Sequence, residues 1–320
     1  MRSPAIDLLR ALTARGPQSR ADLAAACALR MADLERWLAR LAGNGFLVVD
    51  GESVRLCGAF DFLDAERIAA GIGTRAAEID VEVVDACSST SSALMNEAPP
   101  RGTRLLLTEE QVAGRGRRGR RWLSCVGAGL ALSLRRGFSR SARELAPLPL
   151  VAGVATVRAL RTLGAADASL KWPNDVLVHG AKLGGILIET RAQGQQTIAV
   201  TGIGLNCRTT PALAARLGRR IAALEEFVPS LPSRNDVAAR VASELLEALD
   251  AFEAGGFAAF KDAWEAMHEY AGQRLRVRLA DGRVVAGVAD GLAEDGGLRL
   301  RTRHGMRAVK SGRVVSARVA

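Results

Sequence analysis

The sequence predicts an α+β protein built from three successive domains. The first sixty residues have the pattern of three short helices and a β-hairpin, the middle mixes strands with helices, and the end is a series of short alternating strands. A chain of 320 residues has room for two or three domains with sizeable cores. We therefore expect domains at residues 1–60, 61–270 and 271–320.

Composition narrows the class of partner and of compartment. The chain has 48% hydrophobic and 24% charged residues, which is typical of a soluble globular protein. Its 44 basic residues outnumber its 34 acidic ones, so anionic partners are expected: nucleic acid, nucleotides or an acidic protein surface. No apolar span of membrane length and no signal-peptide core are present. We expect a cytoplasmic protein with no membrane partner.

The cysteine pattern argues against two kinds of site. Five cysteines lie far apart without a CxxC pair, and the three histidines are isolated. A disulfide framework or a zinc site needs clustered spacing. We therefore predict no metal-ligating set of protein residues.

In the first domain, apolar residues recur at helical spacing over residues 4–14 and 32–42. Ser19 is a candidate N-cap for a short helix between them. Residues 46–49 and 53–56 flank Asp50-Gly51, which is a hairpin signal. This order is typical of a winged helix-turn-helix, whose third helix enters the DNA major groove.

The same pattern also builds dimerisation or interaction modules. Asp33 and Glu35 lie on the presumptive recognition helix, where carboxylates would repel phosphate. If DNA is bound, we expect the contacts to come from Arg30, Arg36 and Arg40.

The middle domain is predicted to begin with a linker and one helix over residues 58–78, with Asp64 near the helix start. Ser88–Ser92 is a polar run whose hydroxyls either cap a helix starting near Ala93 or contact a ligand, and capping is the commoner role. The other elements expected here are strands at 81–84, 105–107, 130–134, 176–178 and 182–189, one further strand made of 198–200 and 202–206, and helices at 149–163, 235–252 and 257–268.

One stretch of the middle domain is chemically unusual. Gly114–Trp122 contains five arginines and three glycines in nine residues. Glycine allows a close approach of backbone to ligand, and guanidinium groups match phosphate geometry, so this stretch predicts an anion-binding loop. Its glycines fit GxGxxG literally, but a strand follows instead of a helix and no acidic residue stands near Ser139. A dinucleotide-binding fold is therefore excluded.

A second polar cluster follows at Lys171–Asp175, and a strand–turn–strand hairpin brings Lys182 and Gly184-Gly185 after it. The glycines of this hairpin are compatible with a ligand or with ordinary backbone packing. The small residues of Gly202–Asn206 leave room for a planar ligand. After Gly272 the short strands with DG and GG turns predict an SH3-like barrel.

These residues carry a family resemblance. The Gly114–Arg120 loop, the Lys171–Asp175 cluster, Lys182 with Gly184–Leu187, and Gly202–Asn206 look, in this order, like the biotin protein ligases. With its N-terminal domain, the chain resembles the bifunctional members that also repress biotin synthesis. The likeness covers essentially the whole chain and is much looser in the N-terminal part.

The resemblance implies a fold, a reaction and its partners. The fold is a mixed sheet flanked by helices, related to class II aminoacyl-tRNA synthetases. Biotin and MgATP give biotinyl-5'-adenylate, and a lysine of the biotin carboxyl carrier protein of acetyl-CoA carboxylase then attacks it. Repression implies binding of biotin operator DNA by a homodimer formed through the central sheet when adenylate is bound. Biotin, ATP and Mg²⁺ are thus the expected small molecules.

The resemblance also implies roles for residues. Two anions must meet in line during adenylation, and Arg115, Arg117 and Lys182 suit the role of offsetting their repulsion. Asp175 either coordinates Mg²⁺ or helps deprotonate the incoming lysine, and the sequence leaves both open. The implied biotin contacts are Ser89, Thr90, Ser91 (often asparagine in the family), Gln111, Arg115, Gly116, Arg117, Lys182 and Gly185. The implied nucleotide contacts are Arg115, Arg118, Trp122, Lys171, Asn174, Lys182, Asn206 and Arg318.

Three functions remain open at this point: a ligase that also represses transcription, a ligase whose N-terminal domain does something else, and a regulator that binds biotin without chemistry. The intact arginine loop, Lys171, Asp175 and Lys182 argue against the pure regulator, since a sensor needs fewer of them.

Overall fold

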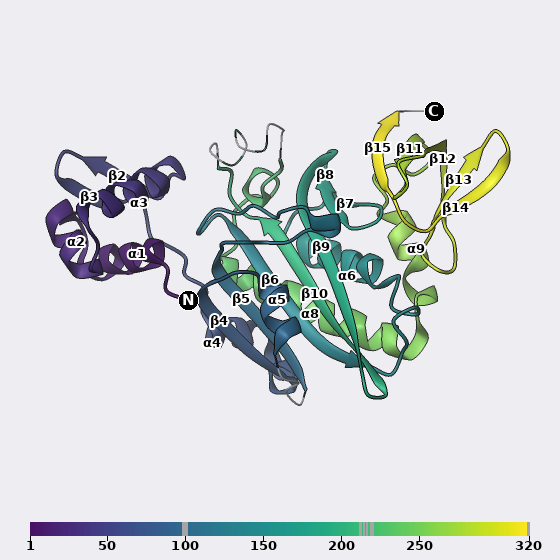
Figure 1. The fold of residues 1–320 in the computed structure, drawn as a ribbon, viewed down its shortest axis with the longest axis horizontal. Coiled ribbons are helices and arrows are strands. Elements are labelled where there is room, and N and C mark those ends of the chain that lie inside the picture. Colours follow the sequence, from purple (N-terminus) through teal and green to yellow (C-terminus); the bar gives the residue numbers. More distant parts are fainter. Residues whose placement is uncertain (98–101, 211–212, 214, 216, 218–220, 319–320) are drawn as a thin grey trace.

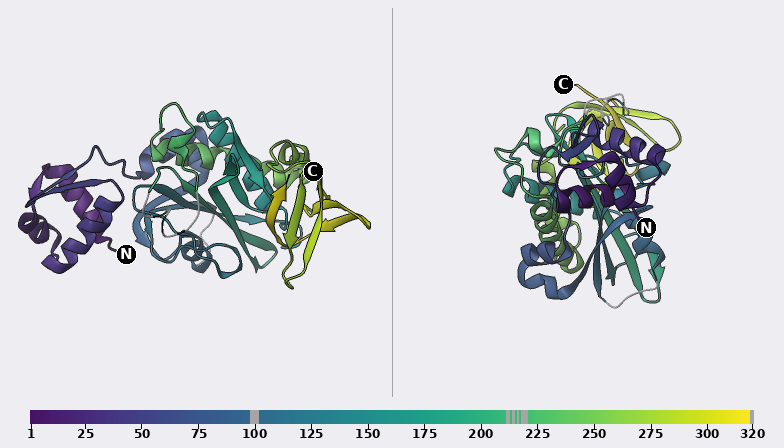
Figure 2. Two further views of the ribbon diagram at one scale, coloured as in Figure 1. Left: turned by 90° about the horizontal axis from the view of Figure 1, so that it is seen from above. Right: turned by 90° about the vertical axis from the view of Figure 1, so that its left-hand side faces the viewer.

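The computed structural model describes residues 1–320 except 98–101, 211–212, 214, 216, 218–220 and 319–320. Its elements form three successive units along the long axis of the molecule, with the N-terminal unit at one end and the C-terminal sheet at the other (Figures 1 and 2). None of the helices in the described ranges is both long and apolar enough to cross a membrane.

The N-terminal unit holds three helices and a small sheet. They are α1 (Pro4–Arg15), α2 (Arg20–Cys27) and α3 (Met31–Gly43), with strands β1 (Gln18–Ser19), β2 (Leu47–Asp50) and β3 (Ser53–Leu56) in the order β1-β3-β2. The side chain of Ser19 accepts a hydrogen bond from the Asp22 N–H at 3.1 Å, so the predicted N-cap is confirmed. The predicted hairpin is also confirmed. β1 was not predicted, because two residues leave no periodic pattern.

The chain then passes through α4 (Ala65–Ile72) and the 3₁₀ helix η1 (Gly73–Glu78). Asp64 caps α4 by accepting from the Arg67 N–H at 2.9 Å. The linker and helix expected at 58–78 are thus confirmed.

A seven-stranded mixed sheet forms the centre. In spatial order its strands are β4 (Ile79–Cys87), β5 (Thr103–Gln111), β6 (Gly129–Phe138), β10 (Gln196–Asn206), β9 (Ala181–Gln193), β8 (Asp175–Val178) and β7 (Ala168–Lys171). β4 and β5 are parallel, and the other neighbours are antiparallel.

The two faces of this sheet are covered by different helices. Leu105 and Leu107 of β5 join the large core formed with α6 (Leu148–Thr162), α8 (Arg234–Gly255) and α9 (Ala258–Ala266). Leu106, between them, packs with Leu94 of α5 (Thr90–Asn96) on the opposite face. This follows from the alternation of side chains along a strand.

The structure differs from the expectations for the central unit at two points, the start of one helix and one missed strand. The helix expected near Ala93 begins at Thr90, because Ser89 is its N-cap and accepts from the Ser92 N–H. The further strand expected over 198–200 and 202–206 is confirmed as β10, in which Thr201 pairs with Ile188 and Leu134. β7 was missed, because its four residues lie between a helix and the polar cluster.

The C-terminal unit is a five-stranded antiparallel sheet in the order β14 (Gly305–Val309), β13 (Leu298–Thr302), β12 (Val284–Leu292), β11 (Arg274–Arg278) and β15 (Arg313–Arg318). The predicted short strands are confirmed. Their buried residues, such as Leu275 and Leu300, belong to the same core cluster as α6 and α9, so this sheet is fixed against the central unit.

Candidate ligand pocket

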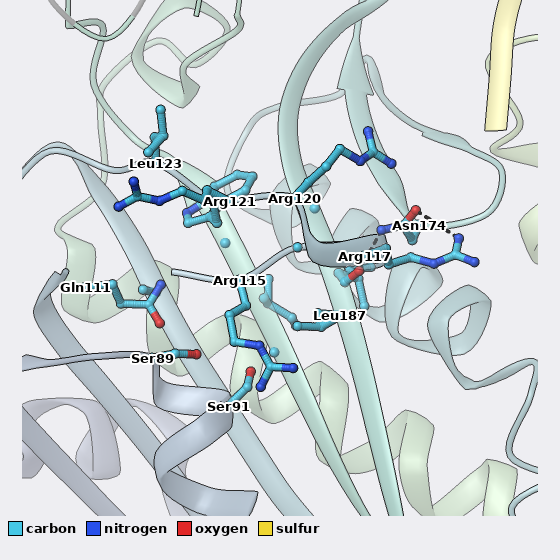
Figure 3. A pocket seen from close by; sticks show the side chains of 18 of the residues that line it. Ser89, Ser91, Gln111, Arg115, Arg117, Arg120, Arg121, Leu123, Asn174 and Leu187 are labelled. Atoms are coloured by element: carbon cyan, nitrogen blue, oxygen red, sulfur yellow. Dashed lines mark hydrogen bonds between the residues drawn. The ribbon is translucent and has the colours of Figure 1, made fainter. Parts of the chain in front are cut away.

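A pocket opens where the central sheet, α5 and the loop between β5 and β6 meet (Figure 3). It encloses about 970 Å³ of empty space, part of which is open to solvent. The loop holds the arginine-rich stretch, with the short 3₁₀ helix η2 (Arg117–Gly119) within it. The chief lining residues are Ser89, Thr90, Ser91, Gln111, Arg115, Gly116, Arg117, Arg120, Arg121, Trp122, Ser133, Asn174, Asp175, Lys182, Gly185, Gly202, Gly204 and Asn206.

One end of the pocket is neutral and polar. The Thr90 N–H donates to Gln111 Oε1 at 2.9 Å, and the hydroxyls of Thr90 and Ser91 lie 2.7 and 3.0 Å from Ser133 Oγ. Ser133 is fully buried in β6. The start of α5 and the end of β5 therefore present a cluster of hydroxyl and amide groups that fits an uncharged polar ligand group.

In the middle of the pocket, glycines let neighbouring side chains lie directly against the strand backbone. An added Cβ at Gly204 would stand 2.4 Å from the Trp122 ring, and one at Gly202 would stand 2.4 Å from Ser91 Oγ. Trp122 thus rests on the backbone of β10 at a site where only glycine fits. Its indole N–H is buried and has no hydrogen-bond partner among the described residues, which leaves one donor in the pocket wall.

The other end is cationic. Arg117 is half-buried and donates to Asn174 Oδ1 at 3.3 Å, while Lys182 pairs with Asp175. Burial, together with the neighbouring Arg118 and Arg120, lowers the pKa of the Arg117 guanidinium. An arginine stays charged in proteins, so this end of the pocket favours an anion.

Arg115 lies at the mouth, with its side chain 49% exposed. It donates to Ser92 Oγ at 2.9 Å and pairs with Glu189 Oε1 at 2.6 Å. The guanidinium is therefore held across the opening between α5 and β9.

A second hollow adjoins the cationic end. It shares Arg117, Asn174, Asp175 and Lys182 with the pocket, and it adds Arg118, Lys171 and Arg313. Arg118 donates to Ser311 Oγ at 3.2 Å, so the arginine loop touches the C-terminal unit. Arg118 lies inside η2 and has a positive φ of 57°, a conformation that is uncommon for residues other than glycine.

Comparison with known proteins identifies the family to which the chain belongs. Residues 83–206 match the biotin/lipoate A/B protein ligase family, and residues 270–315 match the biotin protein ligase C-terminal domain. The biotin--[acetyl-CoA-carboxylase] ligase of Mycobacterium tuberculosis is 32% identical over 258 residues, which is 78% of this chain and 92% of that protein. The chain belongs to the biotin protein ligase family.

Two further relatives bear on the family. The bifunctional ligase/repressor BirA of Escherichia coli is 34% identical over 195 residues, which is 61% of this chain and 60% of that protein. The biotin protein ligase of Aquifex aeolicus, solved in complex with biotin and ATP, superposes with a TM-score of 0.63 at 30% identity, covering 75% of this chain and 99% of that one. The predicted enzyme class, biotin--[acetyl-CoA-carboxylase] ligase, is thus confirmed at the level of the family, as is the mixed α+β ligase fold.

Most residues that the ligase resemblance singled out do meet in space. All nine implied biotin contacts line the pocket, as do Trp122, Asn174 and Asn206 of the nucleotide set. Arg118 and Lys171 line the second hollow instead. Arg318 lies on β15 opposite Arg274, but its side chain is outside the described residues. The assignment of each residue to a ligand stays a prediction.

The arginines predicted for DNA all make ion pairs. Arg30 and Arg36 both pair with Asp33, which holds the pKa of that carboxyl below its usual value. Arg40 pairs with Glu110 of β5, and this contact turns it toward the central unit. The ion pairs therefore largely neutralise the charge of Asp33 that was expected to repel DNA phosphate. Arg40 is held by Glu110 and is turned away from a DNA contact.

The sequence reasoning missed three residues around the ligase pocket. Ser133 was passed over, although a serine within the apolar run Leu130–Leu134 was a usable signal. Glu189 comes from within β9 and Arg313 from the C-terminal unit, and nothing in their local sequence marks them.

Proposed function

We propose that the chain activates biotin with ATP to give biotinyl-5'-adenylate and pyrophosphate, and then transfers the biotin to a lysine of the biotin carboxyl carrier protein of acetyl-CoA carboxylase. The observation that carries the proposal is the polarity of one pocket, which has neutral hydroxyl and amide groups at one end and Arg117 and Lys182 at the other. A cyclic urea with an acidic tail needs this distribution of groups.

The cationic end supplies the electrostatics of the first step. Biotin carboxylate and the α-phosphate repel each other, and fixed positive charge from Arg115, Arg117 and Lys182 offsets that repulsion as they meet in line. Lys182 is oriented for this by its ion pair with Asp175. The arginine loop closes the pocket and keeps water from the labile anhydride.

Asp175 has two proposed roles that the pocket accommodates equally. It lines both hollows and is the carboxylate that faces the cationic end among the residues described there. Mg²⁺ is commonly held by one or two carboxylates together with substrate phosphates, so the residues fit this ion, which supplies charge neutralisation to the triphosphate. As a base, Asp175 would accept a proton from the incoming lysine amine.

Biotin-dependent exchange of labelled pyrophosphate into ATP tests the activation step. We expect exchange only when biotin, ATP and Mg²⁺ are all present. Transfer is then followed as incorporation of biotin into a carrier domain. A protein that binds biotin but catalyses no exchange would be a sensor, and the proposal would be wrong. Intact exchange and transfer in Asp175→Asn would exclude both roles for that residue.

We further propose that the N-terminal unit binds biotin operator DNA as a winged helix-turn-helix. The three helices with their hairpin, and the exposed pair Arg30 and Arg36, favour this function. Relatives named bifunctional ligase/repressor support it. The alternative is a ligase whose N-terminal unit binds no DNA.

A homodimer belongs to the same proposal. β8 pairs with β9 only as far as Gly185, whereas β10 pairs with β9 as far as Gln193. Among the described strands, the segment from Leu187 to Gln193 therefore has no partner on this side, and such an edge is suited to pairing with a second copy. The class II synthetase-like and SH3-like assignments, the three domain limits and a cytoplasmic location complete the proposal.

Two measurements test the repressor proposal. A gel shift with operator DNA should strengthen when biotin and ATP are added, and sedimentation should show a change from monomer to dimer. If the gel shift does not change when biotin and ATP are added, or if no shift occurs, the repressor proposal is wrong and only the ligase function remains. An unchanged mass rules out the adenylate-linked dimer.

A further inference from the structure

The outward face of the C-terminal sheet carries a row of unpaired arginines. Along β11, Leu275 and Val277 point into the core, so Arg274, Arg276 and Arg278 point outward and are exposed. Strand pairing places Arg313 of β15 opposite Arg278, and Arg301 of β13 opposite Val288 of β12. We define the arginine face as Arg274, Arg276, Arg278, Arg301 and Arg313.

Little negative charge offsets this face. Within the described part of the chain, none of its five arginines forms an ion pair with a carboxylate. Asp290 is the outward acid of β12, and it is taken by Arg299. Small apolar residues lie between the arginines on β12, namely Val284 and Ala286, opposite Arg278 and Arg276. The face is thus both basic and partly apolar, and this composition is typical of a surface that binds a partner.

The arginine face extends to the second hollow beside the cationic end of the pocket. Arg313 belongs to the face and also lines the second hollow beside Lys182 and Asp175. Its strand partner Arg278 continues the face away from the hollow. A macromolecule lying on these strands would therefore place its edge at the cationic end of the pocket.

The charge of the hollow indicates what kind of macromolecule fits. Its lining includes Arg117, Arg118, Arg120, Lys171, Lys182 and Arg313, against the single carboxylate of Asp175. An acceptor lysine approaching this cluster is itself a cation and is repelled. An acidic surface around that lysine would offset the repulsion and would be attracted by the arginine face.

We propose that the arginine face is the docking surface for the acidic side of the lysine-bearing carrier protein. This rests on the proposed function, and it adds how the protein substrate is held. Nucleic acid is the competing occupant. The face has no aromatic side chain of the kind on which single-stranded bases stack, and the N-terminal unit lies at the opposite end of the molecule (Figure 1).

The test replaces Arg274, Arg276 and Arg278 together by serine. The three side chains are exposed, so folding and thermal melting should be unchanged. We expect pyrophosphate exchange within about twofold of the starting protein, because the pocket is untouched. The KM for a biotin carboxyl carrier domain should rise by roughly tenfold or more with little change in kcat, since rim charges act on association. The rise in KM with added salt should also be weaker in the variant.

A matched control removes the same charge elsewhere, with Arg15→Ser, Arg67→Ser and Arg158→Ser on α1, α4 and α6. Its KM for the carrier should stay unchanged. An unchanged carrier KM in the β11 variant overturns the proposal. If that variant instead loses binding of a DNA duplex, the face serves nucleic acid and the proposal is equally wrong. Absence of pyrophosphate exchange in the starting protein would refute the ligase function itself, which is a separate outcome.

Discussion

At the scale of single residues, the cationic end of the pocket depends on two side chains, Lys182 and Arg117, that have few hydrogen-bond or ion-pair partners. Lys182 pairs with Asp175, whereas Arg117, within the described part of the chain, donates only to the amide oxygen of Asn174. A guanidinium that is half-buried and lacks a carboxylate partner gains most from an incoming anion. These two side chains are therefore the sharpest tests of the cationic end.

We expect Lys182→Ala and Arg117→Ala each to slow adenylate formation by at least about tenfold. This is the effect of losing one or two charge-assisted hydrogen bonds to the reacting groups. Pyrophosphate exchange measures it. Arg158→Ala, an exposed arginine on α6, is the control and should exchange at the normal rate. Undiminished exchange in either pocket variant would contradict the assigned role.

His268 gives a pH dependence that is unrelated to catalysis. Its side chain is 7% exposed, its ring lies 4.7 Å from that of Trp264, and burial lowers its pKa from 6.5 to about 4. The unfolded chain takes up a proton below about pH 6.5, while the folded one stays neutral until about pH 4. Folding stability from this residue is therefore complete above pH 6.5 and is lost as the pH falls toward 4.

The expected loss is on the order of 3 kcal/mol in the free energy of unfolding between pH 6.5 and pH 4. Urea titrations of the starting protein and of His268→Phe across this range would measure it. Other groups titrate here as well, so the difference between the two proteins is the informative quantity. Parallel pH profiles would show that His268 does not titrate as the structure implies.

At the scale of elements, the middle of the pocket is a contact between one loop and two strands. Trp122 comes from the arginine loop, and it rests against Gly204 of β10 and within 3.5 Å of the Cβ position of Gly185 on β9. The Lys182 ammonium lies 5.8 Å from the centre of the Trp122 ring, within reach of a cation–π contact. The position of the loop is thus set by the smallest residues of the sheet.

Gly204→Ala should displace Trp122, because the new methyl group would lie 2.4 Å from its ring. We expect biotin affinity, measured by calorimetry, to fall by roughly tenfold or more as the loop shifts. Gly255→Ala is the matched control, since a Cβ there meets nothing within 4 Å and the site is at a helix end. Equal affinities for the two variants would mean that the loop does not rely on this contact.

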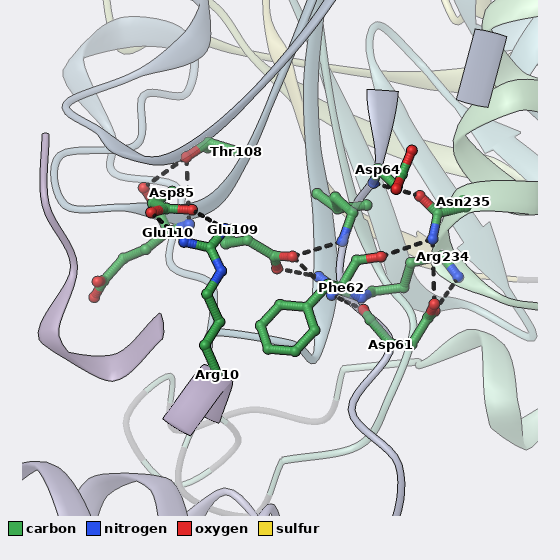
Figure 4. Close-up of polar contacts among 11 residues, drawn as sticks. Arg10, Asp61, Phe62, Asp64, Asp85, Thr108, Glu109, Glu110, Arg234 and Asn235 are labelled. Carbon is green, nitrogen blue, oxygen red and sulfur yellow. Dashed lines mark hydrogen bonds and ion pairs between the residues drawn. The ribbon is translucent and has the colours of Figure 1, made fainter. Parts of the chain in front are cut away.

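At the scale of the whole molecule, the last three residues of β5 connect three parts of the chain. Glu109 accepts from the Leu63 N–H of the linker at 2.7 Å and pairs with Arg234 of α8, as Figure 4 shows. Glu110 accepts from Ser3 Oγ at 2.7 Å and pairs with Arg40 of the N-terminal unit. Gln111 then reaches the pocket. One strand end therefore joins the N-terminal unit, the linker and the ligand site.

The loop after the pocket makes a second connection. Val126 is 2% exposed and belongs to the core cluster of the N-terminal unit, and Gly127 lies against the rings of Phe60 and Phe46. The arginine loop is consequently bounded on both sides by residues that touch the N-terminal unit.

Glu109→Ala should lower the free energy of unfolding by about 3–5 kcal/mol, because it removes the carboxylate that pairs with the buried charge of Arg234 and leaves its guanidinium only the backbone carbonyl of Asp61 as a hydrogen-bond acceptor among the described residues. Urea denaturation measures the loss. Replacing both Glu109 and Arg234 by leucine should recover much of it, since no unpaired charge then remains. The exposed acid Glu66 on α4 provides the control, and Glu66→Ala should cost little. A small effect of Glu109→Ala would indicate that water reaches this pair.

The sequence by itself determined the order of the units and the chemistry of the loop. Apolar periodicity marked α1, α3, α6 and α8, and turn pairs such as Asp50-Gly51 and Asp281-Gly282 marked the hairpins, because these signals are local. The arginine loop and the Lys171–Asp175 cluster were recognisable for the same reason. Short elements such as β1 and β7 were not predicted, because neither has an apolar period or is marked by a turn pair.

The tertiary structure decided which residues from distant parts of the sequence lie next to one another. Ser133 joins Thr90, Arg313 joins Lys182, and Arg40 joins Glu110 across wide gaps in the sequence, through strand pairing and packing that no local pattern encodes. The same holds for the arginine face, whose members come from three strands and meet only through register. Local sequence fixes which groups a segment offers, whereas the pairing of the sheet fixes which of them act together, because side chains on neighbouring strands meet only in one register.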